Sequence, residues 1–133
     1  MPIQSNPIKE AQRYMQNARE ILSEKAGKDG DLYSDPKYVR MAGNTAWNGV
    51  LLALDGSLGV REKKGPRKRV DIADYQTAVN KKDKKMSKYL MVAYDAIHLH
   101  LGYDGILGYK FVQAALEEGD RIITWAAKHY QEK

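Results

Sequence analysis

Small and apolar residues recur about once per helical turn between residues 36 and 58, and this pattern constrains the fold more than any other feature. The positions are Val39, Ala42, Ala46, Gly49 or Val50, and Ala53, with Gly43 beside them. Residues three and four apart share one face of a helix. Small side chains on that face let a second helix approach closely, because the contact residues set the interaxial distance. We therefore expect a central helix from Pro36 to about Leu58.

Two start signals place the first helices. Asn6 is suited to cap a helix that begins at Pro7, and Ser34 or Asp35 followed by Pro36 repeats the signal. The first helix keeps apolar residues at spacings of three and four up to Leu22. The glycines and aspartates of residues 27–31 then end it, which predicts a loop at about residues 27–34.

The second half of the chain adds further helices. Asp71 opens one, with Asp74 three residues later as a variant capping box. The polar run NKKDKK, residues 80–85, suits either one long helix or a break with a new helix starting at Asp83, and we favour the break. Apolar spacing continues from Met86 to a turn at Gly102, and a last helix follows. The prediction is an all-α fold: an up-and-down bundle of four main helices plus one short helix, in a single domain over residues 1–133.

Positive charge is concentrated in one segment. The chain carries a net +5, yet residues 61–88 hold eleven basic and four acidic residues, a net of +7, and the remainder nets −2. Residues 61–69 are predicted to be a solvated loop, and Lys81, Lys84, Lys85 and Lys88 form a single ridge if their stretch is helical. The candidate polyanion-binding residues are Arg61, Lys63, Lys64, Arg67, Lys68, Arg69, Lys81, Lys84, Lys85 and Lys88.

This basic region has two interpretations. It could bind nucleic acid or another polyanion with a steep dependence on salt, or it could only keep the protein soluble. Aromatic residues for stacking on bases are limited to Tyr75 and Tyr89 nearby, so sequence-specific reading of nucleic acid is not indicated.

Several chemistries are excluded or unsupported. The chain has no cysteine, which removes disulfides, thiolate metal sites and a cysteine nucleophile. His98 and His100 are two residues apart and point away from each other on a helix, so we expect no metal site and no cofactor. Neither a serine elbow nor a phosphate-binding loop is present, so we assign no catalytic residue and favour a protein that is not an enzyme. We also expect a cytoplasmic homo-oligomer without a membrane span.

Tyrosine is the commonest aromatic residue, at nine of twelve. Tyrosines often lie at the edge of a core with the hydroxyl group reaching water. Those around the Gly102 turn could instead line a pocket or an oligomer interface. The candidate pocket residues are Tyr94, His98, Tyr103 and Tyr109.

Three segments of the sequence resemble known families of helical proteins. The helices AQRYMQNAREIL and DPKYVRMAGNTAWNGVLLALDGSL resemble the HEPN-type nucleotide-binding helical family over about residues 8–60. That resemblance implies a bundle and association with nucleotides or nucleic acid. Active members carry an Arg followed after about four to six residues by a His, whereas the nearest pair here, Arg121 and His129, has seven residues between. The stretch AYDAIHLHLGYDG also looks like an uncharacterised family of small bacterial helical proteins, which implies the fold alone.

Three functions remain as hypotheses. The leading one is a non-enzymatic interaction module whose residues 61–88 meet an anionic partner. The alternatives are a degenerate HEPN-type ribonuclease or nucleotide-binding protein that uses Arg121 and His129, and a bundle that binds a small ligand near the Gly102 turn.

Overall fold

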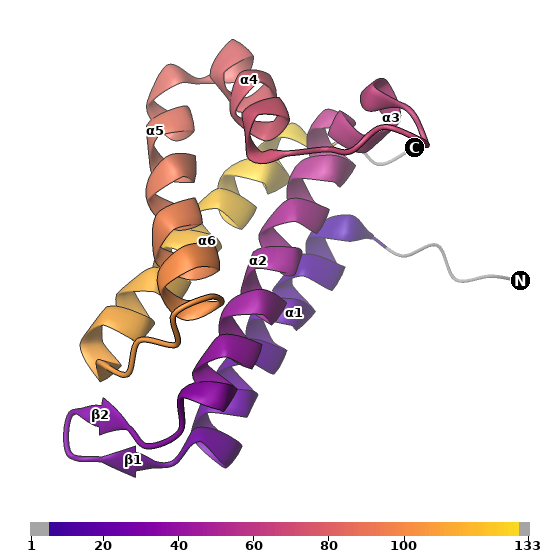
Figure 1. The fold of residues 1–133 in the computed structure, drawn as a ribbon. Helices are drawn as coiled ribbons and strands as arrows, with labels where there is room; N and C mark the ends of the chain where they lie inside the picture. Colours follow the sequence, from indigo (N-terminus) through magenta and orange to yellow (C-terminus); the bar gives the residue numbers. More distant parts are fainter. Residues whose placement is uncertain (1–5, 131–133) are drawn as a thin grey trace, which may run out of the picture.

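A computed structural model describes residues 6–130 as a helical bundle with one short hairpin at its end (Figure 1). In chain order the elements are α1 (Pro7–Ile21), the π-helical η1 (Leu22–Ala26), β1 (Lys28–Asp29), β2 (Leu32–Tyr33), α2 (Pro36–Leu58), α3 (Val60–Lys64), α4 (Ile72–Lys82), α5 (Lys84–Ala93), the π-helical η2 (Tyr94–Leu101) and α6 (Tyr109–His129). The all-α prediction is confirmed, with only two short antiparallel strands added within residues 6–130.

The long helices run alternately up and down (Figure 1). They are α1 with η1, α2, α5 with η2, and α6, while α4 is the predicted short helix at one end. Helix α2 contacts α1, α6 and η2, so it occupies the centre of the bundle. The predicted architecture and its central small-residue helix are therefore confirmed.

Both predicted helix starts are present. The Asn6 side chain accepts hydrogen bonds from the backbone N–H groups of Ile8 and Lys9 at 2.9 and 3.3 Å. The Asp35 carboxylate accepts the N–H of Lys37 at 2.9 Å. These bonds satisfy backbone donors that have no partner in the first turn of a helix.

Asp83 separates α4 from α5, which confirms the favoured break. Its backbone is extended, with φ −162° and ψ 103°. Its N–H donates to the Val79 carbonyl at 2.9 Å, and its carboxylate accepts the N–H of Met86 at 3.0 Å. One residue thus closes the first helix and caps the second.

The segment predicted as a loop at residues 27–34 contains the hairpin of β1 and β2. Gly30 supplies the turn with a φ of 61°. The Tyr33 N–H donates to the Leu107 carbonyl at 2.8 Å, and the Tyr109 N–H donates to the Asp31 carbonyl at 2.9 Å. These long-range bonds order the segment, and the local sequence pattern does not reveal them.

The basic segment predicted as a solvated loop at residues 61–69 instead begins inside helix α3. Gly59 ends α2 in the left-handed conformation, with φ 64°, and turns the chain directly into α3. The side chain of Val60 is buried at 5% exposure and anchors the first turn of α3 against the bundle. Burial of this apolar residue favours an ordered turn over a solvated loop there.

The helix predicted from Met86 changes from α to π winding at Tyr94. The Gly102 N–H donates to the Ile97 carbonyl, five residues back, at 2.9 Å. Here η2 crosses α2 so closely that a Cβ on Gly43 would lie 2.5 Å from the Gly102 backbone nitrogen. A side chain at position 43 would therefore push η2 away from α2 at this crossing.

One hydrophobic cluster runs through all six α-helices. The predicted stripe of α2 lies within it, with 0% exposure at Val39, Ala42, Ala46, Val50 and Ala53. The predicted domain span of 1–133 extends past the described residues at both ends. Within residues 6–130 none of the helices combines the length and apolar character that crossing a membrane requires.

Candidate functional site

The basic segment is fastened to the end of α2 by Asp55. The Asp55 carboxylate accepts the backbone N–H of Arg61 at 3.2 Å and the hydroxyl group of Tyr75 at 3.0 Å. Burial raises the pKa of Asp55, while these hydrogen bonds act in the opposite direction. Burial, followed by the Asp55 charge, raises the pKa of the Tyr75 hydroxyl group, which stays neutral. Asp55 thus ties α3 and α4 to α2.

Two of the basic residues make structural contacts. The Arg61 guanidinium donates to the backbone carbonyls of Gly65 and Lys68 and so closes the turn after α3. The Lys64 ammonium group lies 3.0 Å from an oxygen of Asp74 and joins α3 to α4. The backbone N–H of Asp71, and then Lys64, lower the pKa of Asp74. Arg61 and Lys64 therefore hold the segment together.

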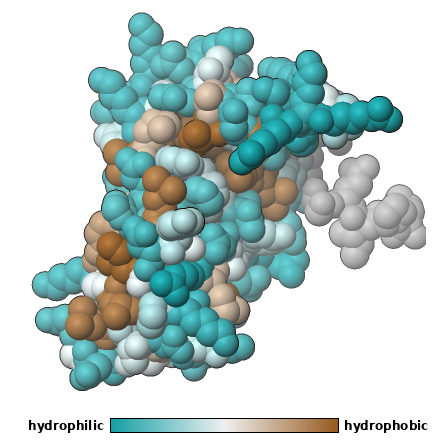
Figure 2. Space-filling model, viewed as in Figure 1, coloured by the Kyte–Doolittle hydropathy of each residue, from teal (hydrophilic) through white to brown (hydrophobic). Residues whose placement is uncertain are grey.

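A groove of about 230 Å³ lies between α3 and α4, and we call it the basic groove. Its lining is Leu58, Val60, Lys63, Lys64, Asp74, Thr77, Ala78, Lys81 and Lys82. The lining thus combines four lysines with three apolar residues, and its single carboxylate is already paired with Lys64. In Figure 2 hydrophilic side chains cover this end of the molecule, with hydrophobic ones visible between them.

The other predicted basic residues lie outside the groove. Those of the loop and of α5 are exposed, and they are Arg67, Lys68, Arg69, Lys84, Lys85 and Lys88. The condition for a single ridge of lysines is not met, because Asp83 ends the helix that carries Lys81 before the helix of the other three lysines begins. Lys82 lines the groove although the spacing of the lysines did not predict it.

The structure divides the predicted tyrosine pocket. Tyr94 and His98 pack on Trp47, with ring centroids 5.6 and 5.8 Å from that indole. The Nδ1 atom of His98 is buried and has no hydrogen-bond partner among residues 6–130. Tyr103 is 79% exposed. Tyr109 lies instead against Tyr33, at a centroid distance of 5.5 Å.

The histidines have separate surroundings. His100 contacts Phe111 and lies 3.6 Å from an oxygen of Asp104, whereas His98 faces Trp47. Within residues 6–130 no three metal-binding side chains gather at one point.

Arg121 and His129, the pair weighed for ribonuclease chemistry, also have different partners. The Arg121 guanidinium lies 4.6 Å from the centroid of the Tyr89 ring, and its Nε atom is 3.5 Å from a carboxylate oxygen of Glu118. His129 packs on Trp125 at a centroid distance of 4.4 Å. The two residues are eight positions apart, which is about 12 Å along a helix axis, and each side chain is engaged by its own neighbours.

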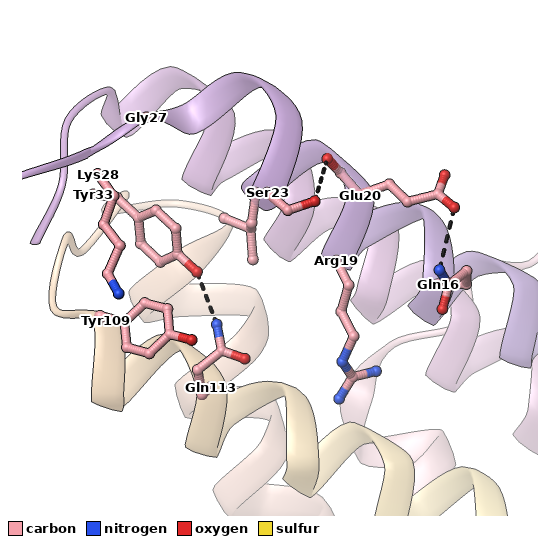
Figure 3. Close-up of a pocket in the computed structure, with 10 residues that line it drawn as sticks. Gln16, Arg19, Glu20, Ser23, Gly27, Lys28, Tyr33, Tyr109 and Gln113 are labelled. Carbon is pink, nitrogen blue, oxygen red and sulfur yellow. Dashed lines mark hydrogen bonds between the residues drawn. The ribbon is translucent and has the colours of Figure 1, made fainter.

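A second cavity, of about 430 Å³, lies between α1, the hairpin and α6, and we call it the hairpin pocket (Figure 3). Of the predicted pocket residues it takes in Tyr109 alone. The other polar residues of its lining were not predicted from the sequence, and they include Gln16, Arg19, Lys28 and Gln113. No local signal marked them, since the periodicity places them on polar helix faces and in a loop.

The chain was compared with curated sequences, solved structures and family models. A search of curated sequences gave no match. A solved structure, a protein of unknown function from Dyadobacter fermentans, is similar with a TM-score of 0.82 and 35% identity, over 92% of this chain and 93% of that one. None of the findings names a HEPN protein, and they agree with the resemblance to an uncharacterised family. A family model described as a domain of unknown function, DUF5618, matches residues 6–128, so the chain belongs to that family.

Proposed function

We propose that this protein is an interaction module that binds an anionic partner at the basic groove. The observation that carries the proposal is a groove lined by four lysines together with an apolar floor, which we assign to Leu58, Val60 and Ala78. A merely solubilising charge needs no such floor, since scattered surface lysines serve equally well. A floor ringed by cations suits a ligand that is both acidic and partly apolar.

The groove retains most of its positive charge. Lys64 is neutralised by Asp74, but Lys63, Lys81 and Lys82 form no ion pair within residues 6–130. Unpaired cations beside a low-dielectric floor attract an anionic partner and raise the rate of encounter. The sequence outside residues 61–88 has a net charge of −2, which does not attract an anionic partner. Residues 61–88 are therefore the favoured place of contact.

The aromatic residues of this region favour an acidic protein segment over nucleic acid. Binding of single strands commonly uses exposed rings on which bases stack. Tyr75 is only 5% exposed, and the Tyr89 ring is covered by Arg121. An acidic peptide with an apolar side chain matches both the lysines and the floor of the groove.

Fluorescence anisotropy tests the proposal with three labelled probes: a Glu-rich peptide containing leucines, single-stranded RNA and duplex DNA. Titrations run from about 0.02 to 0.5 M salt, over which screening of exposed charges becomes strong. The double variant Lys81→Glu, Lys82→Glu is expected to weaken peptide binding at low salt at least about tenfold, since each reversal replaces attraction with repulsion. The control Lys25→Glu, Lys110→Glu changes two exposed lysines at the hairpin end of the bundle and leaves affinity unchanged.

Undetectable peptide binding at low salt, or equal binding by the two double variants, would overturn the proposal. Tighter binding of RNA or DNA than of the peptide would overturn the choice of partner while keeping the groove as the site. Light scattering on the same samples measures the oligomeric state, which stays a prediction.

A further inference from the structure

The hairpin pocket is built from segments far apart in the sequence. Gln16 and Arg19 come from α1, Lys28 and Tyr33 from the hairpin, and Tyr109 and Gln113 from α6 (Figure 3). Its volume of about 430 Å³ lies in the range of small-molecule sites, which is roughly 300 to 1,000 Å³. The pocket shares no lining residue with the basic groove, so binding here does not depend on the proposed function.

Two tyrosine rings form one wall of the pocket. Tyr33 and Tyr109 are inclined at 44° to each other with centroids 5.5 Å apart. The Lys28 ammonium group lies 3.7 Å from the centroid of the Tyr109 ring, where the ring attracts the cation. Tyr33 is 5% exposed and its N–H is bonded to Leu107, so its position is fixed. This wall is an aromatic surface of two rings inclined to each other, with a positive charge over one of them.

The hydrogen-bond pattern leaves a donor unused at this wall. The Gln113 amide donates to the Tyr33 hydroxyl oxygen at 2.8 Å, which leaves the hydroxyl hydrogen of Tyr33 for another acceptor. Burial raises the pKa of Tyr33, so this hydroxyl group remains protonated at neutral pH. In Figure 3 the Tyr33 hydroxyl group and the Lys28 ammonium group lie beside the Tyr109 ring.

The one carboxylate in the pocket lining, Glu20, and the carboxylate of Asp120 beside Arg19 both have partners. Arg19 holds Asp120 through two contacts of 2.6 and 3.4 Å, which neutralises that charge. Glu20 accepts the Gln16 amide at 3.2 Å and extends away from the tyrosine wall in Figure 3. Lys28 makes no ion pair within residues 6–130. The wall therefore offers a cation that has no ion pair among these residues and a neutral donor.

We propose that the hairpin pocket binds a small organic anion, with its carboxylate or phosphate group at Lys28 and the Tyr33 hydroxyl group and its planar part along the tyrosine wall. A charge-assisted bond to Lys28 and a bond from Tyr33 hold the anionic group. The rings of Tyr33 and Tyr109 supply an apolar surface for the planar part. Neither interaction alone selects such a ligand, but together they require both features in one molecule.

Titration by two-dimensional amide NMR tests this assignment with four probes: benzoate, phenyl phosphate, benzyl alcohol and inorganic phosphate. Benzoate or phenyl phosphate is expected to give saturable shifts at the amides of Tyr33 and Gln113. Benzyl alcohol lacks the charge and inorganic phosphate lacks the ring, so each binds at least about tenfold more weakly. Whichever of benzoate and phenyl phosphate binds more tightly identifies the anionic group of the ligand as a carboxylate or a phosphate.

Two variants and a control locate the binding. Lys28→Gln removes the cation and Tyr33→Phe removes the donor, and each is expected to weaken the better probe about tenfold. Lys25→Gln, at an exposed neighbouring lysine outside the pocket lining, leaves the affinity unchanged. The proposal is overturned if neither aromatic anion gives saturable shifts, if benzyl alcohol or inorganic phosphate binds equally well, or if Lys25→Gln weakens binding as much as Lys28→Gln. Unchanged helical circular dichroism confirms that each variant is folded.

Discussion

Replacing Gly43 with alanine tests a helix crossing at which backbone meets backbone. The added Cβ would lie 2.5 Å from the backbone nitrogen of Gly102 and 2.6 Å from the Cβ of Leu101. Real Cβ atoms do not approach other atoms within 3.0 Å. The obstacles belong to the backbone and the base of a side chain, so η2 itself must move away from α2.

The size of the effect is set by two opposing contributions. Alanine in a helix interior is more stable than glycine by about 0.5 to 1 kcal/mol. Overpacking a rigid crossing costs about 1 to 3 kcal/mol. We expect Gly43→Ala to lower the free energy of unfolding by about 1 to 2 kcal/mol, or the melting temperature by roughly 3 to 8 °C for a chain of this size.

Gly119→Ala provides a matched control in another helix interior. Its added Cβ would meet the Ile97 Cδ1 atom at 3.0 Å and the Met15 Cε atom at 3.1 Å. These atoms are the ends of flexible side chains and can rotate away, so the gain in helix propensity offsets the crowding. We expect a change within about 0.5 kcal/mol of zero.

Urea unfolding followed by far-ultraviolet circular dichroism measures both variants. The midpoint should fall for Gly43→Ala at an unchanged slope and stay near the wild-type value for Gly119→Ala. Equal midpoints for Gly43→Ala and the wild type, or equal shifts for the two variants, would refute the idea that backbone contact at this crossing determines the cost.

Three aspartates give further predictions, each read from thermal or urea unfolding. The pKa of Asp74 is lower in the fold than its unfolded value of 3.8, so its ionised carboxylate stabilises the fold above pH 3.8. Asp74→Asn is therefore expected to have a lower melting temperature than the wild type at neutral pH, and this difference in melting temperature should shrink as the pH falls below 3.8. The raised pKa of Asp55 makes its ionisation unfavourable in the fold, so Asp55→Asn gains stability relative to the wild type as the pH rises from 3.8 through the raised pKa. The same pH trend for both variants would contradict this reasoning. Asp83→Ala removes the cap of α5 and is expected to cost about 1 kcal/mol, whereas Asp83→Asn keeps most of it, and equal loss in the two would rule out capping as the cause.

The features that the sequence predicted correctly depend on contacts between close neighbours in the chain. The caps at Asn6, Asp35 and Asp83 bond to backbone N–H groups two or three residues away. Such a bond needs only the right side chain beside a helical pattern. The central position of α2 was predictable in the same way, because small residues at helical spacing determine how closely a neighbour can pack.

The two candidate sites depend on contacts that local patterns do not contain. The Tyr33 and Gln113 side chains are 80 residues apart in the sequence, and Arg19 and Asp120 are 101 apart. A period of 3.6 residues assigned Arg19 to a polar face without showing what that face meets. In the basic segment, the extended backbone of Asp83 changes the direction of the chain after Lys82, so the spacing of lysines along one ideal helix no longer describes their positions.

The basic groove and the hairpin pocket lie at opposite ends of the bundle, and this separation makes the two proposals independent. Helix α2 has 23 residues and so spans about 34 Å between the hairpin and α3. Exposed charges are screened within about 8 to 10 Å at moderate salt. A charge change at Lys28 therefore leaves the groove unaffected, and one at Lys81 leaves the pocket unaffected, so each variant is a further control for the other site. A loss of binding at both sites from one substitution would indicate a change in the fold, because distant and unconnected sites respond additively.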